Sequence, residues 1–314
     1  MSISGNSMKK TRSIYHGVGY FKRNYQLYLM LVPLVVLFIM FRVMPLTGLQ
    51  VAFRDFNIFR PMSEADWVGL HWFRELFGSR DFTRILRNTI TISLLDIVFL
   101  FPAPIIFALL LTEIRHAIYK KLAQSFSYLP FFLSWAIVGG MFISMMQPFS
   151  GLARHWFELT SNEPRMLIFD QAMFYPMLIT ATMWREVGWA SIIYMAAISG
   201  IDPELHEAAI VDGASRFRRV ISITLPGLAF IISLQLIFAV GNIINQGFDR
   251  IMILANDMTW EVADVFSTYA FRIGIGRQRF SFNTALGLFE SSVSFVLVFA
   301  ANKIAKMMGQ EGIF

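Results

Sequence analysis

The stretch that governs the fold lies between two long apolar segments and reads Asp202-Pro203-Glu204-Leu205-His206-Glu207-Ala208-Ala209-Ile210-Val211-Asp212-Gly213-Ala214. Asp202 is suited to cap the amino end of a helix, and Pro203 fits the first helical position. Gly213 can adopt the left-handed conformation that ends a helix. The pattern therefore predicts a helix of about ten residues, about 15 Å long, which is too short to cross a bilayer.

The composition around this stretch is typical of a membrane protein. Of the 314 residues, 56% are hydrophobic and only 15% are charged, whereas soluble domains carry about 25% charge. The chain has no cysteine, which excludes disulfides, a thiol nucleophile and a cysteine–zinc site. The formal charge is +6, but no basic stripe with interleaved aromatics is present, so we expect no nucleic-acid partner.

The apolar segments predict six membrane-spanning helices, because each is close to the roughly 20 residues needed to cross the hydrocarbon core. We expect them near residues 25–46, 88–111, 122–153 with a core at 128–146, 173–198, 220–248 and 284–302. The membrane part of the fifth is expected to follow Pro226. The sequence thus predicts an all-α membrane protein.

The lysines predict the orientation of these spans. With six spans, Lys9, Lys10, Lys22, Lys120, Lys121, Lys303 and Lys306 all fall on one side of the membrane. Basic residues mark the cytoplasmic side, so we expect both termini there. The expected organisation is a cytoplasmic tail at 1–24, a six-helix domain at 25–307 with a cytoplasmic loop at 200–226, and a second tail at 308–314.

The cytoplasmic loop resembles the "EAA" loop of binding-protein-dependent ABC importer permeases. The matching residues are Glu207, Ala208, Ala209, Asp212, Gly213, Ala214, Ile223, Leu225 and Pro226, with Val220 where the family motif has phenylalanine. The resemblance implies the type I ABC importer fold. It also implies that these nine residues couple the chain to an ATPase, with Glu207 as an anchor and Gly213 as the break between two helical segments.

Other parts of the chain resemble the complex-carbohydrate branch of the same family, which includes alginate importers. The stretches that carry this resemblance are residues 45–48, 52–53, 67–70, 88–89, 108–113, 184–189 and 196–203. The implied function is import of an oligo- or polysaccharide, most specifically alginate or a related uronate, across the bacterial inner membrane. A neutral complex oligosaccharide remains an alternative substrate.

The energy source must lie on another chain. An ABC transporter holds the ATP phosphates with a Gly-x-x-x-x-Gly-Lys-Ser/Thr loop, and this sequence contains no Gly-Lys pair. We therefore expect this chain to bind no cofactor, and ATP and Mg²⁺ to bind to partner subunits. The family pattern implies a second permease subunit as heterodimer partner, two ATP-binding subunits and an external solute-binding protein.

Charged and aromatic residues within the spans are candidates for the substrate pathway, because an intramembrane charge is functional by default. The candidates are Arg185, Trp184, Trp189, Asn242 and Gln246. For Arg185 an equal alternative is a structural ion pair with Asp96 or Glu290. Glu186 is interpreted as structural.

The sequence also has features of two other functional classes. An ion-coupled secondary transporter would use Asp96, Arg185 and Glu290 as a relay, but it does not explain the loop spacing. A membrane-embedded enzyme is disfavoured, because His206-Glu207 lacks the second histidine of a zinc-protease helix and no Gly-x-Ser-x-Gly turn is present. We expect neither catalytic residues nor a metal site.

Overall fold

The computed structural model describes residues 24–149, 151–160, 166–244, 247–307 and 309. Among these residues every regular element is helical, and the one β pairing is an isolated bridge between Arg54 and Trp67. The chain divides into two units, one ending at Gln50 and one beginning at Val51. The tails expected at 1–24 and 308–314 lie almost wholly outside the described residues.

The first unit is one apolar helical stretch. It contains α2 (Tyr25–Phe38), η1 (Ile39–Val43) and most of η2 (Met44–Phe53). No residue of α2 is buried by other parts of the chain, although its residues are mostly large and apolar. An apolar helix exposed in this way needs lipid or another subunit around it, because water would leave its side chains hydrated at high cost.

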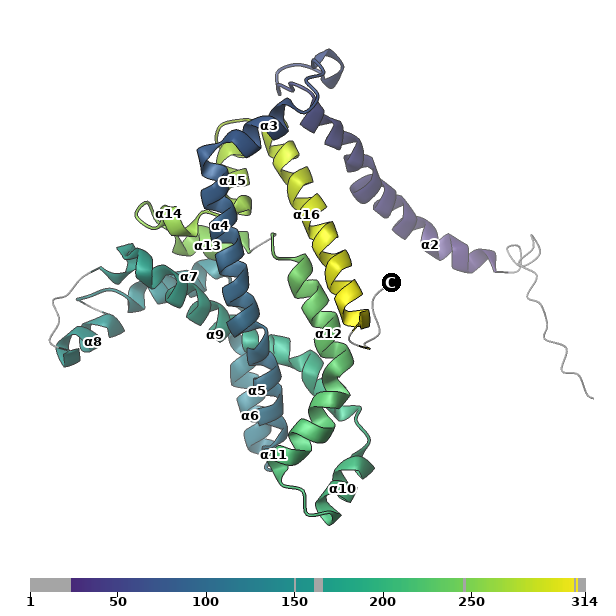
Figure 1. Ribbon diagram of the computed structural model, residues 1–314, viewed down its shortest axis with the longest axis vertical. Helices are drawn as coiled ribbons and strands as arrows, with labels where there is room; N and C mark the ends of the chain where they lie inside the picture. The colour runs from purple at the N-terminus through teal and green to yellow at the C-terminus, as the bar shows by residue number, and fades with distance from the viewer. Residues whose placement is uncertain (1–23, 150, 161–165, 245–246, 308, 310–314) are drawn as a thin grey trace, which may run out of the picture. The chain divides into compact units, whose positions relative to one another are not determined.

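The second unit holds the remaining elements, which Figure 1 shows. They are η3 (Met62–Glu64), α3 (His71–Gly78), α4 (Arg80–Leu95), η4 (Asp96–Leu100), α5 (Pro102–Thr112), α6 (Ala117–Tyr128), η5 (Leu129–Phe132), α7 (Trp135–Met145), α8 (Leu152–Thr160), η6 (Leu167–Phe169), α9 (Gln171–Ser199), α10 (Pro203–Val211), α11 (Arg216–Arg219), η7 (Val220–Thr224), α12 (Leu225–Gly241), α13 (Phe248–Leu254), α14 (Trp260–Ala263), α15 (Phe266–Ala270), η8 (Phe271–Ile275) and α16 (Phe280–Met307).

Four continuous helical stretches are long and apolar enough to cross a membrane. They are Tyr25–Phe53, Arg80–Thr112, Arg216–Gly241 and Phe280–Met307. They coincide with the first, second, fifth and sixth predicted spans. The fourth predicted span corresponds to α9, a helix of 29 residues that is about 44 Å long but is not among these four.

The third predicted span is not a straight helix. The stretches Ala117–Phe132 and Trp135–Met145 meet at an angle of 101°. Pro130 lacks the N–H that would continue the helix, and Ser134 is extended at ψ 154° while its hydroxyl accepts a hydrogen bond from the Ile137 N–H at 3.3 Å. The sequence prediction overlooked that this serine starts a new helix.

Three wide π-helical turns each lie immediately before a proline. The N–H of Met44 bonds to the Ile39 carbonyl, that of Phe101 to Asp96 and that of Leu225 to Val220, and in each case the next residue is proline. A proline in an α-helix removes one hydrogen bond and clashes with the carbonyl four residues earlier. The wider turn moves that carbonyl away, so the helix continues past the proline. For this reason the helical stretch that corresponds to the fifth predicted span begins at Arg216 and runs through Pro226 without a break.

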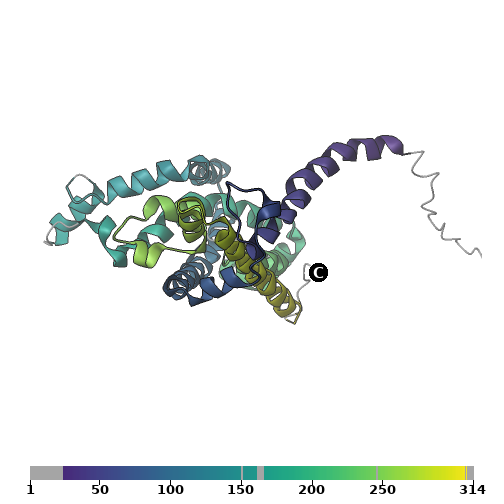
Figure 2. The ribbon, with the colours of Figure 1, turned by 90° about the horizontal axis from the view of Figure 1, so that it is seen from above.

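Two glycines allow helices of the second unit to pack closely. A Cβ at Gly188 on α9 would lie 2.0 Å from the Ser127 carbonyl oxygen of α6, and one at Gly241 on α12 would lie 2.4 Å from Val298 of α16. One apolar core surrounds Phe174, Leu178 and Ile251, and a second surrounds Phe266 and Phe282. Seen from above, the α7–α8 segment extends away from α16 (Figure 2).

Candidate functional site

The helix predicted from residues 202–214 is α10, which runs from Pro203 to Val211. Asp202 caps it as predicted, since its Oδ1 accepts a hydrogen bond from the Glu204 N–H at 3.0 Å. In Figure 1, α10 lies at the end of the second unit farthest from α3. The short helix is therefore presented at one extremity of the unit.

A tight turn ends α10 at the predicted glycine. Gly213 has a φ of +75°, which only glycine adopts without strain. The Ala214 N–H bonds to the Ala209 carbonyl at 2.8 Å, and the Gly213 N–H bonds to the Ile210 carbonyl at 3.0 Å, which is the Schellman arrangement. The following α11 begins at once, capped by Ser215. The prediction that Gly213 separates two helical segments is confirmed in geometry.

The outward surface of this loop is apolar as well as charged. Glu207 and Ala208 are exposed and Ala209 is half-buried. Five large apolar side chains are also exposed on the loop: Leu205, Ile210, Val211, Phe217 and Ile221. Exposed apolar residues grouped in this way are typical of a protein interface.

Several contacts hold the loop to the helices behind it. Arg216 pairs with Glu113 at the end of α5 at 3.6 Å. A Cβ at Gly227 would lie 2.8 Å from the Ile201 side chain, so the start of α12 approaches the start of the loop closely. Leu225 packs beside the core of α5 and α9, Ile223 is half-buried and Pro226 is exposed. These contacts tie the two ends of the loop to α5, α9 and α12.

A largely buried ion pair joins η4 and α13, and a hydrogen bond links it to α9. The two Nη atoms of Arg250 on α13 donate to the two carboxylate oxygens of Asp96 on η4, and Nη1 also donates to Thr182 Oγ1 of α9 at 3.3 Å. The Arg250 side chain is 7% exposed and that of Asp96 17%. The sequence offered Arg185 as a partner of Asp96, and the structure corrects this: the partner is Arg250, which lies outside the six predicted spans.

The Arg185 side chain interacts with groups close to it and not with Asp96. Its Nε donates to the Leu133 carbonyl at 3.1 Å and its Nη1 to Glu186 Oε1 at 3.0 Å. The guanidinium also lies 5.2 Å from the Phe131 ring centroid and 5.0 Å from that of Trp135, a cation–π geometry. Arg185 therefore fixes the bend between η5 and α7 against α9. Within the described residues it forms no ion pair with Asp96 or Glu290, which was the structural alternative.

Two adjoining cavities lie beside the Arg250–Asp96 pair. One, of about 330 Å³, is lined by Asp96, Arg250, Glu186, Trp135 and Asn242 among others. The other, of about 780 Å³, is more apolar and is lined by Trp189, Tyr194, Gln235 and Asn242 among others. Their volumes lie in the range of ligand pockets.

The structure brings together only some of the five residues predicted to line the substrate pathway. Asn242 lines both cavities and Trp189 lines one. Arg185 and Trp184 are not among the lining residues, and Gln246 lies outside the described residues. Sequence reasoning missed Arg250, although the apolar Ile251–Leu254 stretch that follows it was a sign of a buried helix.

Known proteins with similar sequences show the family of this chain. The family described as "Binding-protein-dependent transport system inner membrane component" matches residues 76–308. The protein LplB of Bacillus subtilis is 40% identical over 293 residues, covering 93% of this chain and 92% of its own length. The polygalacturonan/rhamnogalacturonan transport system permease protein YteP of the same organism is 38% identical over 288 residues, covering 92% and 90%.

Solved structures agree with the sequence relatives. A chain of a bacterial ABC transporter involved in the import of the acidic polysaccharide alginate superposes with a TM-score of 0.85 at 36% identity, covering 92% of this chain and 98% of that one. A chain of a bacterial alginate ABC transporter in complex with an alginate-pentasaccharide-bound periplasmic protein gives 0.86 at 35% identity, covering 94% and 99%. This chain therefore has the type I ABC permease fold and belongs to the family of inner-membrane components of binding-protein-dependent transport systems.

Proposed function

We propose that this chain is one permease subunit of an ATP-driven importer of acidic oligo- or polysaccharides, either alginate or a related uronate polymer. It crosses the inner membrane six times with both termini in the cytoplasm and forms half of the pathway with a second permease. Two partner subunits bind ATP and Mg²⁺, and a periplasmic solute-binding protein delivers the substrate. The loop at 200–226, with its predicted coupling residues, contacts the ATPase.

The coupling loop is the observation that carries this proposal. Gly213 and Asp202 define the two ends of α10, and the wide turn at Val220–Thr224 joins α11 to α12 without interrupting the helix. Asn242 follows α12 and lines both cavities. One continuous helical rod thus connects the exposed α10 region to the candidate pathway, as a rigid-body switching mechanism requires.

The acidic substrate is supported by the more similar relatives. YteP carries polygalacturonan and rhamnogalacturonan in its name, and both solved structures are of alginate transporters, at 35–38% identity. Relatives whose names include neutral sugars are more distant, such as the diacetylchitobiose permease NgcF at 26%.

Uptake by the reconstituted complex tests the proposal. This chain, its partner permease and the ATPase are placed in vesicles with the binding protein, and uptake is measured for alginate, galacturonan and neutral oligosaccharides. We expect ATP-dependent uptake of an acidic chain. Uptake of neutral sugar alone would reject the substrate class, and uptake driven by an ion gradient without ATP would reject the importer mechanism.

A further inference from the structure

A basic turn joins α5 to α6. Its three cations are Arg115, which lies between the two helices, and Lys120 and Lys121, which lie near the start of α6. Arg115 and Lys121 are exposed and Lys120 is half-buried. In Figure 1, α5, α6 and α11 lie near the end of the second unit that carries α10. In the proposed orientation this end faces the cytoplasm, so the basic turn stands at the cytoplasmic side of the membrane.

The positive charge of the basic turn is not neutralised within the described residues. None of its three side chains forms an ion pair or a hydrogen bond there. Glu113, the acidic residue next to it, pairs instead with Arg216 of α11 at 3.6 Å. The first turn of α6 contains no acidic residue, and the helix dipole disfavours cations near the amino end of a helix. The stability of α6 therefore does not explain Lys120 and Lys121.

An exposed apolar stripe runs along α6 from the basic turn. Ile118, Leu122 and Phe126 are 74%, 48% and 72% exposed, and their spacing of four residues places them on one face of the helix. The stripe is about 12 Å long and leads into the third predicted span. Tyr119 beside it is also exposed, and tyrosine and lysine together are typical of the boundary between membrane and water. This face of α6 therefore enters the bilayer directly below the three cations.

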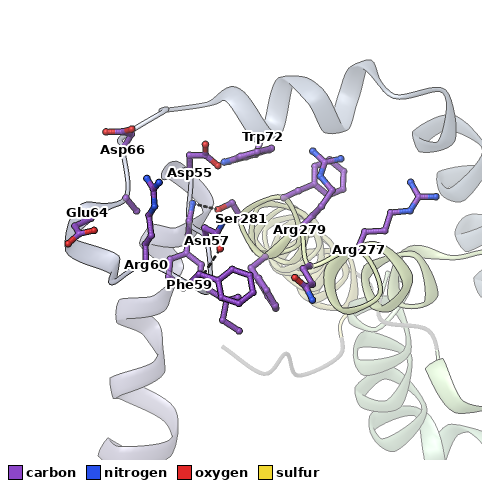
Figure 3. A pocket seen from close by; sticks show the side chains of 16 residues that line it. Asp55, Asn57, Phe59, Arg60, Glu64, Asp66, Trp72, Arg277, Arg279 and Ser281 are labelled. Carbon is purple, nitrogen blue, oxygen red and sulfur yellow. Dashed lines mark hydrogen bonds between the residues drawn. The ribbon is translucent and has the colours of Figure 1, made fainter.

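The pocket at the opposite end of the second unit has a different charge pattern (Figure 3). Its volume is about 520 Å³, and Asp55, Glu64 and Asp66 line it together with Arg60 and Arg277. Charges of both signs offset one another in that pocket. The basic turn, by contrast, presents charge of one sign, which attracts a surface of uniform opposite charge.

We infer that the basic turn binds the phosphate of an anionic phospholipid in the cytoplasmic leaflet, whose acyl chains lie along the apolar stripe of α6. The inference rests on the orientation in the proposed function. Arg115, Lys120 and Lys121 supply charge-assisted hydrogen bonds to the phosphate oxygens. Basic residues at the cytoplasmic ends of membrane helices are a recurrent form of anionic-lipid recognition.

The combination of charge and stripe favours a lipid over a soluble occupant. A phospholipid carries its phosphate and its apolar chains in one molecule, so it covers both features at once. A soluble anion neutralises the cations but leaves Ile118, Leu122 and Phe126 uncovered. A cytoplasmic protein such as the ATPase reaches the charges but not a stripe that continues into the bilayer.

Quenching of a fluorophore on α6 measures which lipid lies beside the basic turn. The chain has no cysteine, so Ser125→Cys provides one labelling position on the exposed face of α6. The labelled chain is assembled with cysteine-free partner subunits in phosphatidylcholine vesicles, and a low mole fraction of brominated phosphatidylglycerol or brominated phosphatidylcholine is added. We expect phosphatidylglycerol to quench about tenfold more effectively, and high salt to reduce this preference because the charges are screened.

Variants then locate the preference on the basic turn. Arg115→Gln and Lys121→Gln are each expected to lower it about fivefold, which is the contribution of one basic residue near an anionic membrane surface, and Lys121→Arg is expected to keep it. The matched control is Lys306→Gln, which removes an exposed cation from the end of α16 on the same proposed side. A surface change outside the site should leave the preference within about twofold of wild type.

Three results would overturn the inference. Equal quenching by the two lipids would show that the turn does not select an anionic lipid. An equal loss in Lys306→Gln and Lys121→Gln would show diffuse attraction to the membrane instead of a site. Loss of the ATPase from the purified complex of Lys121→Gln, with the lipid preference intact, would assign the turn to that partner.

ATP-driven saccharide uptake by the same vesicles separates this inference from the proposed function. Uptake without a lipid preference rejects the inference and leaves the proposed function standing. A lipid preference that the neutral variants remove, without uptake of any saccharide, rejects the proposed function and supports the lipid site.

Discussion

Removing one member of the Arg250–Asp96 pair is expected to destabilise the chain strongly. The Arg250 side chain is 7% exposed and that of Asp96 17%, so either single change leaves a buried charge without its partner. Such a change costs about 3–5 kcal/mol, whereas replacing both members by apolar residues of similar size is often close to neutral. We therefore expect losses of about 3–5 kcal/mol for Asp96→Leu and for Arg250→Met.

The double variant Asp96→Leu with Arg250→Met tests whether the two residues stabilise the chain as a pair or independently of each other. It is expected to lose much less than the sum of the single variants, because no unpaired charge is left in the double variant. The assay is denaturant unfolding of the purified chain in detergent, with Arg80→Ala as an exposed control. Single variants as stable as wild type, or losses that simply add, would refute the assignment of a buried structural pair.

The other predictions concern the coupling loop, a helix crossing and Arg185. Gly213→Pro and Glu207→Lys are expected to abolish uptake while the two permeases still co-purify; coupled uptake and ATPase activity in both variants would reject the lever role of the loop. Gly188→Val should prevent folding, because its Cβ would fall 2.0 Å from the Ser127 carbonyl oxygen; a normal yield and unfolding midpoint would contradict that packing. Arg185→Ala should lower stability by about 1–3 kcal/mol with no change in the concentration of binding protein that half-stimulates the ATPase; a shifted half-stimulation with unchanged stability would instead place Arg185 in the pathway.

The coupling loop was predictable because its geometry is set by local chemistry. Asp202, Pro203 and Gly213 each act on the backbone within one turn, and α10 begins and ends where they predict. Long apolar stretches likewise predicted the helices in the membrane, because no other open structure satisfies the backbone there. These features need no knowledge of distant contacts.

The buried pair was not predictable from the same pattern. Asp96 and Arg250 are separated by 154 residues, and their pairing depends on how α13 packs between α7 and α9. The bend at Ser134 was missed for a related reason, since its apolar neighbours look like one continuous span. Hydropathy reports how apolar a segment is and not the path that the chain takes, so a short buried helix such as α13 cannot be recognised from it.

The glycine contacts at Gly188 and Gly241 determine which parts of the molecule can slide. At Gly188 the α9 backbone packs against the backbone of α6, and at Gly241 the α12 backbone packs against the Val298 side chain of α16, so the helices of each couple are in close contact there. In the proposed importer, each of these couples is therefore expected to move as a single block, and the opening and closing of the route to take place at other contacts.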